Sequence, residues 1–206
     1  MSATSRLKEL RWHLRRGRKK VARIVGFNRR RRRAIKRLEA ELETRAMFDS
    51  VTISEIPKSA GAVAGYTGGS WPTYWDLVKE FPHAFVLDIA VASSYDARCL
   101  DIESGDATVA EAIPWLRRQH ARGVKRPRLY IAVSGASQLL ALLDDAGYRQ
   151  GRDYLLWTAH WTFEPHLCGP HSCGALQSTT ADATQWTDQA LGRNLDQSLV
   201  SPEFIG

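Results

Sequence analysis

From Ala46 onward, short apolar segments of strand length alternate with segments of helical periodicity. Four or five of the apolar segments are nearly continuous, which is typical of strands buried on both faces of a parallel sheet. Several intervals are long enough for a helix, as the connections between parallel strands require. We expect strands near 46–53, 62–69, 84–91, 98–104, 126–134, 153–161, 181–187 and 193–200, and helices near 71–81, 107–123 and 137–147.

Eight strands of this kind favour a closed barrel over an open sheet. The predicted fold class is therefore α/β, a compact (β/α)8 TIM-like barrel over residues 46–206, with an N-terminal basic helical extension over residues 1–45. A barrel of this type typically has about 250 residues, and this segment has only about 160. We therefore expect several connecting helices to be reduced to turns.

The first 45 residues differ from the rest of the chain in charge. They hold 17 Lys and Arg against four Glu, a net charge of +13, whereas the remainder has a net charge of −6. Gly26 to Asn28 predicts a break between two basic helices. We expect this arm to bind nucleic acid, lipid head groups or wall polymers, although a solvated arm that only aids solubility fits the same composition. The candidate anion-binding residues are Arg15, Arg16, Arg18, Lys19, Lys20, Arg29, Arg30, Arg31, Arg32 and Arg33.

No apolar run approaches the length of a membrane span, which is about 18 residues or more, and the N-terminal region lacks the apolar core of a secretory signal. We therefore expect no transmembrane segment and synthesis in the cytoplasm.

Acidic residues gather at the end of the fourth expected strand, in RCLDIESGDAT. Asp101 and Glu103 are two residues apart, so on a strand their side chains would share one face at a separation of about 7 Å. Like charges at that distance raise at least one pKa, which suits a carboxyl group that must donate a proton near neutral pH. A solvated strand end, or carboxylates that cap the next helix, would explain the same pattern.

Function in a barrel of this type gathers at the carboxyl ends of the strands. Asp49 on the first strand and Asp196 on the last would then meet Asp101 and Glu103 at one mouth of the barrel. Aromatic and amide groups beside carboxylates are what a sugar-binding cleft uses. The candidate substrate contacts are Tyr66, Trp157, His160, Gln185 and Trp186.

Cysteine is sparse, and Cys99 reads as a small buried residue in an apolar run. The segment HLCGPHSCG contains His166, Cys168, His171 and Cys173, four potential zinc ligands. Their spacing matches no zinc-finger or zinc-ribbon pattern, and a local disulfide or a plain loop would suit it equally. The expectation from sequence is no metal and no cofactor, with this set as the alternative.

An ordered set of segments over residues 47–204 resembles glycoside hydrolase family 25, the Chalaropsis-type lysozymes. The segments are CLDIESGDAT, AIPWLRRQHARG, RPRLYIA, LWTAHW, ATQWT and NLDQS. Further segments look like divergent relatives of that family in actinobacteria and their bacteriophages: FDSVTISEIP, AVAGYTGGSWPTY, FPHA and ADATQWTDQALGRNLDQS.

The resemblance implies a (β/α) barrel that hydrolyses the β-1,4 bond after N-acetylmuramic acid in peptidoglycan. It implies Glu103 as general acid, Asp101 as the second carboxylate, and Asp49 and Asp196 as acids from the first and last strands. It also implies peptidoglycan glycan strands as the partner of the barrel, and release at lysis or carriage in a phage particle.

Two segments depart from the family pattern. Asp49 is followed by SVTISEIP where the family has Asp-Val-Ser and a Gln-Gly step, and AFVLDIAVASS replaces a polar third strand. Whether the barrel is an active enzyme therefore stays open. The alternative is an inactive barrel that serves as a structural or binding protein of a phage virion, with the arm binding a virion protein or nucleic acid.

Overall fold

A computed structural model describes residues 31–32 and 46–206 of the chain. Apart from Arg31 and Arg32, which are helical and exposed, the basic arm predicted over residues 1–45 lies outside the described residues. Arg45–Gly206 forms one compact unit. In the part of the chain that is described, no helix has both the length and the apolar character needed to cross a membrane.

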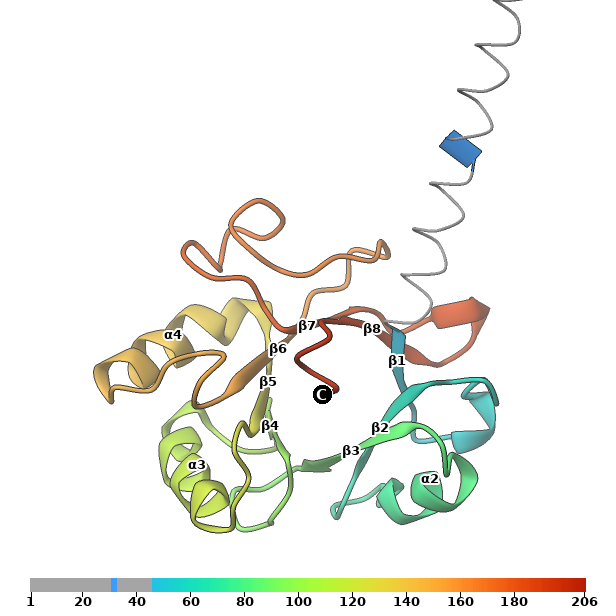
Figure 1. The fold of residues 1–206 in the computed structure, drawn as a ribbon, viewed down its shortest axis with the longest axis horizontal. Coiled ribbons are helices and arrows are strands. Elements are labelled where there is room, and N and C mark those ends of the chain that lie inside the picture. The colour runs from blue at the N-terminus through green and yellow to red at the C-terminus, as the bar shows by residue number, and fades with distance from the viewer. Residues whose placement is uncertain (1–30, 33–45) are drawn as a thin grey trace, which may run out of the picture. The chain divides into compact units, whose positions relative to one another are not determined.

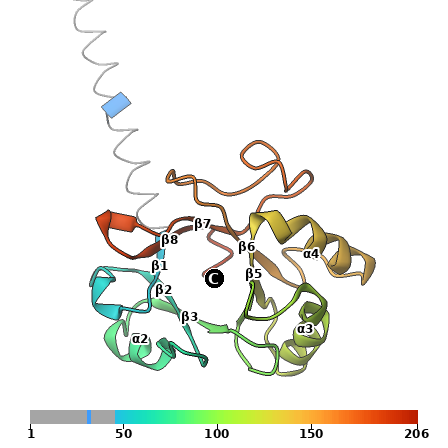
Figure 2. The same ribbon diagram turned by 180° about the vertical axis from the view of Figure 1, so that it is seen from behind.

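Eight strands close into a barrel in chain order, each hydrogen-bonded to the next and the last to the first (Figures 1 and 2). This confirms the predicted compact α/β barrel, and every predicted strand is present in shortened form. The strands are β1 (Ala46–Asp49), β2 (Ala62–Tyr66), β3 (Phe85–Ala90), β4 (Cys99–Ile102), β5 (Arg128–Ala132), β6 (Leu155–Ala159), β7 (Ala183–Thr187) and β8 (Asp196–Val200).

The direction of β8 differs from an all-parallel arrangement. β1 to β7 pair in parallel, whereas β8 runs antiparallel to both β7 and β1. Eight residues separate β7 from β8, and eight also separate β3 from β4, which pair in parallel, so the length of the connection does not set the direction of β8. The reversal places the first residue of β8, Asp196, beside the last residue of β1, Asp49.

The connections are shorter than in a full-sized barrel, as expected from the chain length. Three α-helices lie outside the strands: α2 (Tyr74–Glu80), α3 (Ala112–Ala121) and α4 (Val133–Asp145). Single 3-10 turns complete the described connections: η1 (Ile53–Glu55), η2 (Val109–Glu111) and η3 (Ala190–Gly192). Thr108 and Glu111 form a capping box at the start of η2, which leads directly into α3.

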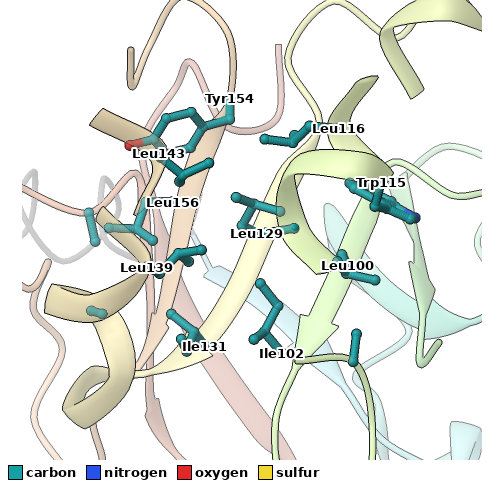
Figure 3. Packing of buried hydrophobic residues seen from close by; sticks show 14 of the residues in the cluster. Leu100, Ile102, Trp115, Leu116, Leu129, Ile131, Leu139, Leu143, Tyr154 and Leu156 are labelled. Atoms are coloured by element: carbon teal, nitrogen blue, oxygen red, sulfur yellow. The ribbon is translucent and has the colours of Figure 1, made fainter. Parts of the chain in front are cut away.

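The outward faces of β4, β5 and β6 form the largest core with α3 and α4 (Figure 3). Leu100 and Ile102 face the helices from β4, and Leu129 and Ile131 do so from β5, so the residues that face outward are two apart. Trp115 of α3 is fully buried in this cluster. The nearly continuous apolar strands seen in the sequence are explained by this outer layer together with the filled barrel interior.

The interior of the barrel changes from apolar at one end to polar at the other, as β1 and β4 show. Met47 precedes Asp49 on the inward side of β1, and Cys99 precedes Asp101 on β4. Leu155, Ala183 and Val200 fill the same apolar end from the other side of the barrel. The polar end is therefore the end at which the parallel strands finish.

The C-terminal segment closes the apolar end of the barrel, and the chain ends over the middle of the ring of strands (Figure 1). Phe204 is fully buried there and packs edge-on against Trp157, with ring centroids 6.0 Å apart. The guanidinium of Arg128 lies 5.4 Å from the Phe204 ring and donates a hydrogen bond to the Phe204 carbonyl. Within the described barrel, the C-terminal segment therefore leaves the opposite end open to a ligand along the barrel axis.

Candidate functional site

Four carboxyl groups meet at the polar end of the barrel. Asp49 ends β1, Asp196 begins β8, and the two residues are directly opposite each other in the antiparallel ladder. Asp101 lies on β4 and Glu103 just beyond its end. The charges of Asp196, Asp101 and Glu103 all raise the pKa of Asp49, so residues far apart in the sequence share one electrostatic site. The structure therefore brings together the four acids that the sequence selected.

Asp101 is the most buried of the four acids, with 1% of its surface exposed. Burial, followed by the charges of Glu103 and Asp106, raises its pKa to about 8. The Tyr66 hydroxyl donates to Asp101 Oδ2 at 3.4 Å and partly opposes this rise. Asp101 is therefore mostly protonated at neutral pH, and it lies beneath the surface of the site.

Asp49 and Asp196 behave as a proton-sharing pair. Burial first, and then the charge of Asp196, raise the pKa of Asp49 well above its ordinary value. Burial also raises the pKa of Asp196, whereas hydrogen bonds from Asp49 and Gln185 oppose that rise. Because Asp196 is only half-buried, it offers the site an accessible carboxylate while Asp49 retains the proton.

Glu103 is the acid that is open to solvent at the rim. Its pKa is raised by desolvation and then by the charges of Asp106 and Asp196. The turn after Glu103 is closed by the Asp106 N–H, which donates to the Glu103 carbonyl at 3.0 Å. Gly105 in this turn has a φ of +99°, a conformation that favours glycine. An accessible carboxyl group with a raised pKa fits a proton donor.

A buried amide connects the acids to the rim. Gln185 is 3% exposed, and its Oε1 accepts hydrogen bonds from Tyr130 at 2.7 Å and from Trp161 Nε1 at 3.0 Å. Trp161 itself is 54% exposed. Its indole ring is thus held by a fixed polar contact while much of the ring stays open to solvent, as suits stacking against a sugar.

Several buried polar atoms at this end of the barrel have no hydrogen-bond partner among the described residues. They are Asp49 Oδ2, Asp101 Oδ1, Trp186 Nε1 and Asp188 Oδ1. Buried polar atoms are rarely left without a partner in folded proteins. Their accumulation near one rim is the pattern expected of a site that a polar ligand or ordered water completes.

Two residues that were predicted to contact substrate do not face the rim. Trp157 is 1% exposed, donates to Ser198 Oγ at 3.0 Å and packs on Tyr130, so the prediction that it contacts substrate is wrong. It lies two residues before the end of β6, one layer below the rim. His160 directs its Nδ1 to His166 and Cys168, and so faces the loop that follows β6.

The remaining predicted contacts belong to the rim. Tyr66 and Gln185 lie beside the acids, as described above. Trp186 is half-buried at an irregularity of β7, where the pairing with β8 shifts between Gln185 and Thr187. Contact of any of these side chains with a substrate stays a prediction.

Tyr130 and two exposed aromatic residues, Trp71 and Tyr95, were not predicted from the sequence. Tyr130 is inward-facing between the outward-facing Leu129 and Ile131, and this alternation was available as a signal. Trp71 follows β2 and Tyr95 follows β3, and they are 60% and 45% exposed. Aromatic residues in loops that follow barrel strands were the signal for them.

The predicted metal-ligand set is only partly brought together. His171 is exposed, whereas Cys168 and Cys173 are buried and lie close to His160. All three cysteines of the chain fall within the described residues and are free, which contradicts the alternative of a local disulfide.

A cavity of about 530 Å³ lies away from the acids, on the outer surface of the barrel. It is lined by α4 residues such as Ser137 and Asp144 and by the loop residues Gln177 to Thr179. It contains none of the four carboxyl groups.

No family model matches the sequence. A search of curated proteins also finds no match. Among solved structures, the chain is similar to the crystal structure of the bacterial lysozyme from Streptomyces coelicolor, with a TM-score of 0.48 and 10% sequence identity. The match covers 78% of this chain and 94% of the lysozyme chain. The case for a function therefore depends on the side chains of the rim.

Proposed function

We propose that the protein is a peptidoglycan hydrolase of the muramidase type, with its active site at the polar end of the barrel. The observation that carries the proposal is the meeting of Asp49, Asp101, Glu103 and Asp196 at one rim, with their pKa values raised by burial and by one another. Glycoside hydrolysis needs such a set, because one carboxyl group must donate a proton while another carries negative charge.

Glu103 is the proposed general acid. Loss of its proton would add a negative charge beside Asp106 and Asp196, so the carboxyl group keeps the proton until a leaving oxygen accepts it. Asp196 is the accessible carboxylate that faces the positive charge developing on the sugar ring, or the water that attacks it. Asp101 and Asp49 hold protons below the surface and keep the neighbouring charges in balance.

The rim aromatics would bind the glycan strand. Trp161 and Trp71 expose much of their rings near the ends of β6 and β2, and an apolar sugar face packs well on such rings. The cationic arm would hold the enzyme near anionic wall polymers, where the substrate is concentrated. Phage or actinobacterial origin, with release at lysis or carriage in a virion, is part of the same proposal.

The second candidate is a barrel without catalytic activity that serves as a binding or structural protein of a virion. Its specific support is β3, whose inward residues Leu87 and Ile89 are apolar and whose only acid, Asp88, is paired with Arg98. One strand thus brings no polar group to the proposed cleft.

The substitution Glu103→Gln tests the proposal. We expect it to lower the release of reducing ends from purified cell walls by about 10² to 10⁴-fold, the usual contribution of general acid catalysis. The melting temperature should stay the same or rise, because the change removes carboxylate repulsion. Wild-type protein that releases no reducing ends from walls would rule out the hydrolase and leave the binding protein.

Glu203→Gln is the matched control. Glu203 is exposed near the C-terminus, at the opposite end of the barrel from Glu103, and its side chain is the same chemical group. Activity of this variant should equal that of the wild type. Equal losses in both variants would show that the assay reports general damage instead of a catalytic proton.

A further inference from the structure

Four potential metal ligands lie together in the connection between β6 and β7. Three ligand atoms lie within 4.8 Å of one another: a ring nitrogen of His160 and the Sγ atoms of Cys168 and Cys173. His160 Nδ1 is 3.3 Å from Cys168 Sγ. His166 Nε2 lies 3.0 Å from His160 Nδ1 and 3.6 Å from Cys168 Sγ.

These distances agree with the edges of a tetrahedral zinc site. With Zn–N bonds of about 2.05 Å and Zn–S bonds of about 2.3 Å, tetrahedral geometry gives about 3.4 Å between two nitrogens and about 3.6 Å between nitrogen and sulfur. The observed separations of 3.0, 3.3 and 3.6 Å fall close to these values. These separations relate His160, His166 and Cys168, and Cys173 Sγ lies within 4.8 Å of the ligand atoms of His160 and Cys168.

The surroundings of His166 orient the ring for this role. Its Nδ1 lies 2.9 Å from the Glu164 carbonyl and 3.2 Å from the Thr162 hydroxyl. A hydrogen on Nδ1 that is donated to the carbonyl leaves a lone pair on Nε2, the atom that points into the cluster. Metal-bound histidines usually hold their second nitrogen in this way.

The two cysteines are held in place by the backbone of the loop. Cys168 N–H donates to Thr184 Oγ1 of β7 at 2.8 Å, and Cys173 N–H donates to the Gly169 carbonyl at 2.9 Å. Both cysteines are buried, at 0% and 7% exposed. The site is thus built into the fold and is closed to water on the sulfur side, as structural zinc sites are.

The connection between β6 and β7 is long, and a bound metal would stabilise it. It runs between the end of β6 at Ala159 and the start of β7 at Ala183 without a helix or strand. A loop of this length without secondary structure is uncommon in a compact domain and needs other means to hold its conformation. A bound metal cross-links its two halves, and so stabilises it.

We propose that His160, His166, Cys168 and Cys173 form a structural zinc site that holds the connection between β6 and β7. Two nitrogen and two sulfur ligands in tetrahedral arrangement select zinc over the hard cations that prefer oxygen. The proposal revises the expectation of no metal, and it replaces His171 of the predicted set by His160. It is independent of the hydrolase activity, because none of the four residues is a proposed catalytic group.

Metal analysis of the full-length protein tests the site. Protein prepared without chelator should contain about one zinc ion per chain. After removal of zinc, added Co²⁺ should give the intense visible bands of a tetrahedral site and a thiolate-to-cobalt charge-transfer band. Chelation should lower the melting temperature of the wild type.

Matched variants distinguish loss of the metal site from the general effect of replacing a cysteine or a histidine. Cys173→Ser and His166→Ala should lose most of the zinc and the cobalt spectrum, whereas Cys99→Ser and His171→Ala should keep both. Cys99 is a buried cysteine inside the barrel, and His171 is an exposed histidine of the same loop.

Wild-type protein that takes up neither zinc nor Co²⁺ would overturn the proposal and leave a cluster held by hydrogen bonds alone. Binding that Cys173→Ser and His171→Ala weaken equally would also overturn it. The cobalt spectrum of the wild type decides the matter even if a ligand variant fails to fold.

Discussion

Some residues at the rim of the barrel lower the free energy of unfolding, as is expected of residues that serve the site. Asp101 is nearly fully buried, yet Oδ1 has no hydrogen-bond partner among the described residues. A buried carboxyl group that is protonated when folded and ionised when unfolded favours the unfolded state at neutral pH. Such a position is expected where function, and not stability, determines the residue.

Asp101→Asn should therefore stabilise the protein at neutral pH. The pKa of Asp101 is about 8 in the folded protein against an ordinary value of 3.8. Its proton is thus bound in both states below about pH 4 and only in the folded state between about pH 4 and 8. The unfolding free energy of the wild type should fall as pH rises through that window, and Asn should remove this fall.

Urea unfolding of both proteins from pH 4 to pH 8 measures the effect. The stabilisation by Asn should be small at pH 4 and reach about 5 kcal/mol at pH 8, because each unit by which the pKa is raised corresponds to about 1.4 kcal/mol. The Tyr66 hydroxyl can still donate to the amide oxygen, so the local geometry is retained. A constant difference across this range would mean that Asp101 titrates normally in the folded protein.

What the sequence could show about single residues depended on periodicity. The two-residue spacing of Asp101 and Glu103 predicted that their carboxyl groups share one space, and the charge of Glu103 does raise the pKa of Asp101, although Glu103 lies just beyond the end of β4. Periodicity gives the side of a strand but not the depth along the barrel axis. For that reason Trp157 was assigned to the rim, although it lies one layer below it.

At the scale of elements, α2 packs so closely on β2 that one position of the strand has no room for a side chain. A Cβ on Gly65 would lie 2.5 Å from Leu77 Cδ1 and 2.8 Å from Thr73 Oγ1. Leu77 is fully buried and is the buried residue of α2. It therefore cannot move aside without disturbing the core around it.

Gly65→Ala should destabilise the fold by about 1 to 3 kcal/mol, the usual cost of overpacking. Gly61→Ala is the matched control, because a Cβ there meets nothing within 4 Å, and its effect should stay within about 0.5 kcal/mol. Thermal or denaturant unfolding of the two variants provides the comparison. If Gly65→Ala were as mild as Gly61→Ala, α2 would have to be more loosely attached to β2 than the structure indicates.

The order of the elements could be predicted, but two connections could not. The intervals with helical periodicity correctly located α2, α3 and α4, since each buries one apolar face. The direction of β8 was missed because the length of a connection does not reveal it: an equally short connection joins β3 to β4, which pair in parallel. The convergence of His160 with Cys168 could not be predicted, because it depends on the path of an irregular loop.

For the whole molecule, the dominant feature is the difference in charge between the arm and the barrel. Residues 1–45 carry a net charge of +13 and the remainder −6. Contacts between such an arm and a polyanion release counterions, so the binding constant should fall linearly with salt on logarithmic axes. On duplex DNA, the slope is about −0.9 for each phosphate contacted.

Replacement of Arg29 to Arg33 by Gln should reduce the steepness of this slope by up to about 4.5 if all five residues contact phosphate. Fluorescence titration with labelled duplex DNA and with an anionic wall polymer, at several salt concentrations, gives the slopes. Arg117→Gln with Lys125→Gln, two exposed basic residues of the barrel, should leave the slopes nearly unchanged. Binding that does not vary with salt would exclude phosphate contacts and leave a protein partner, or no partner, for the arm.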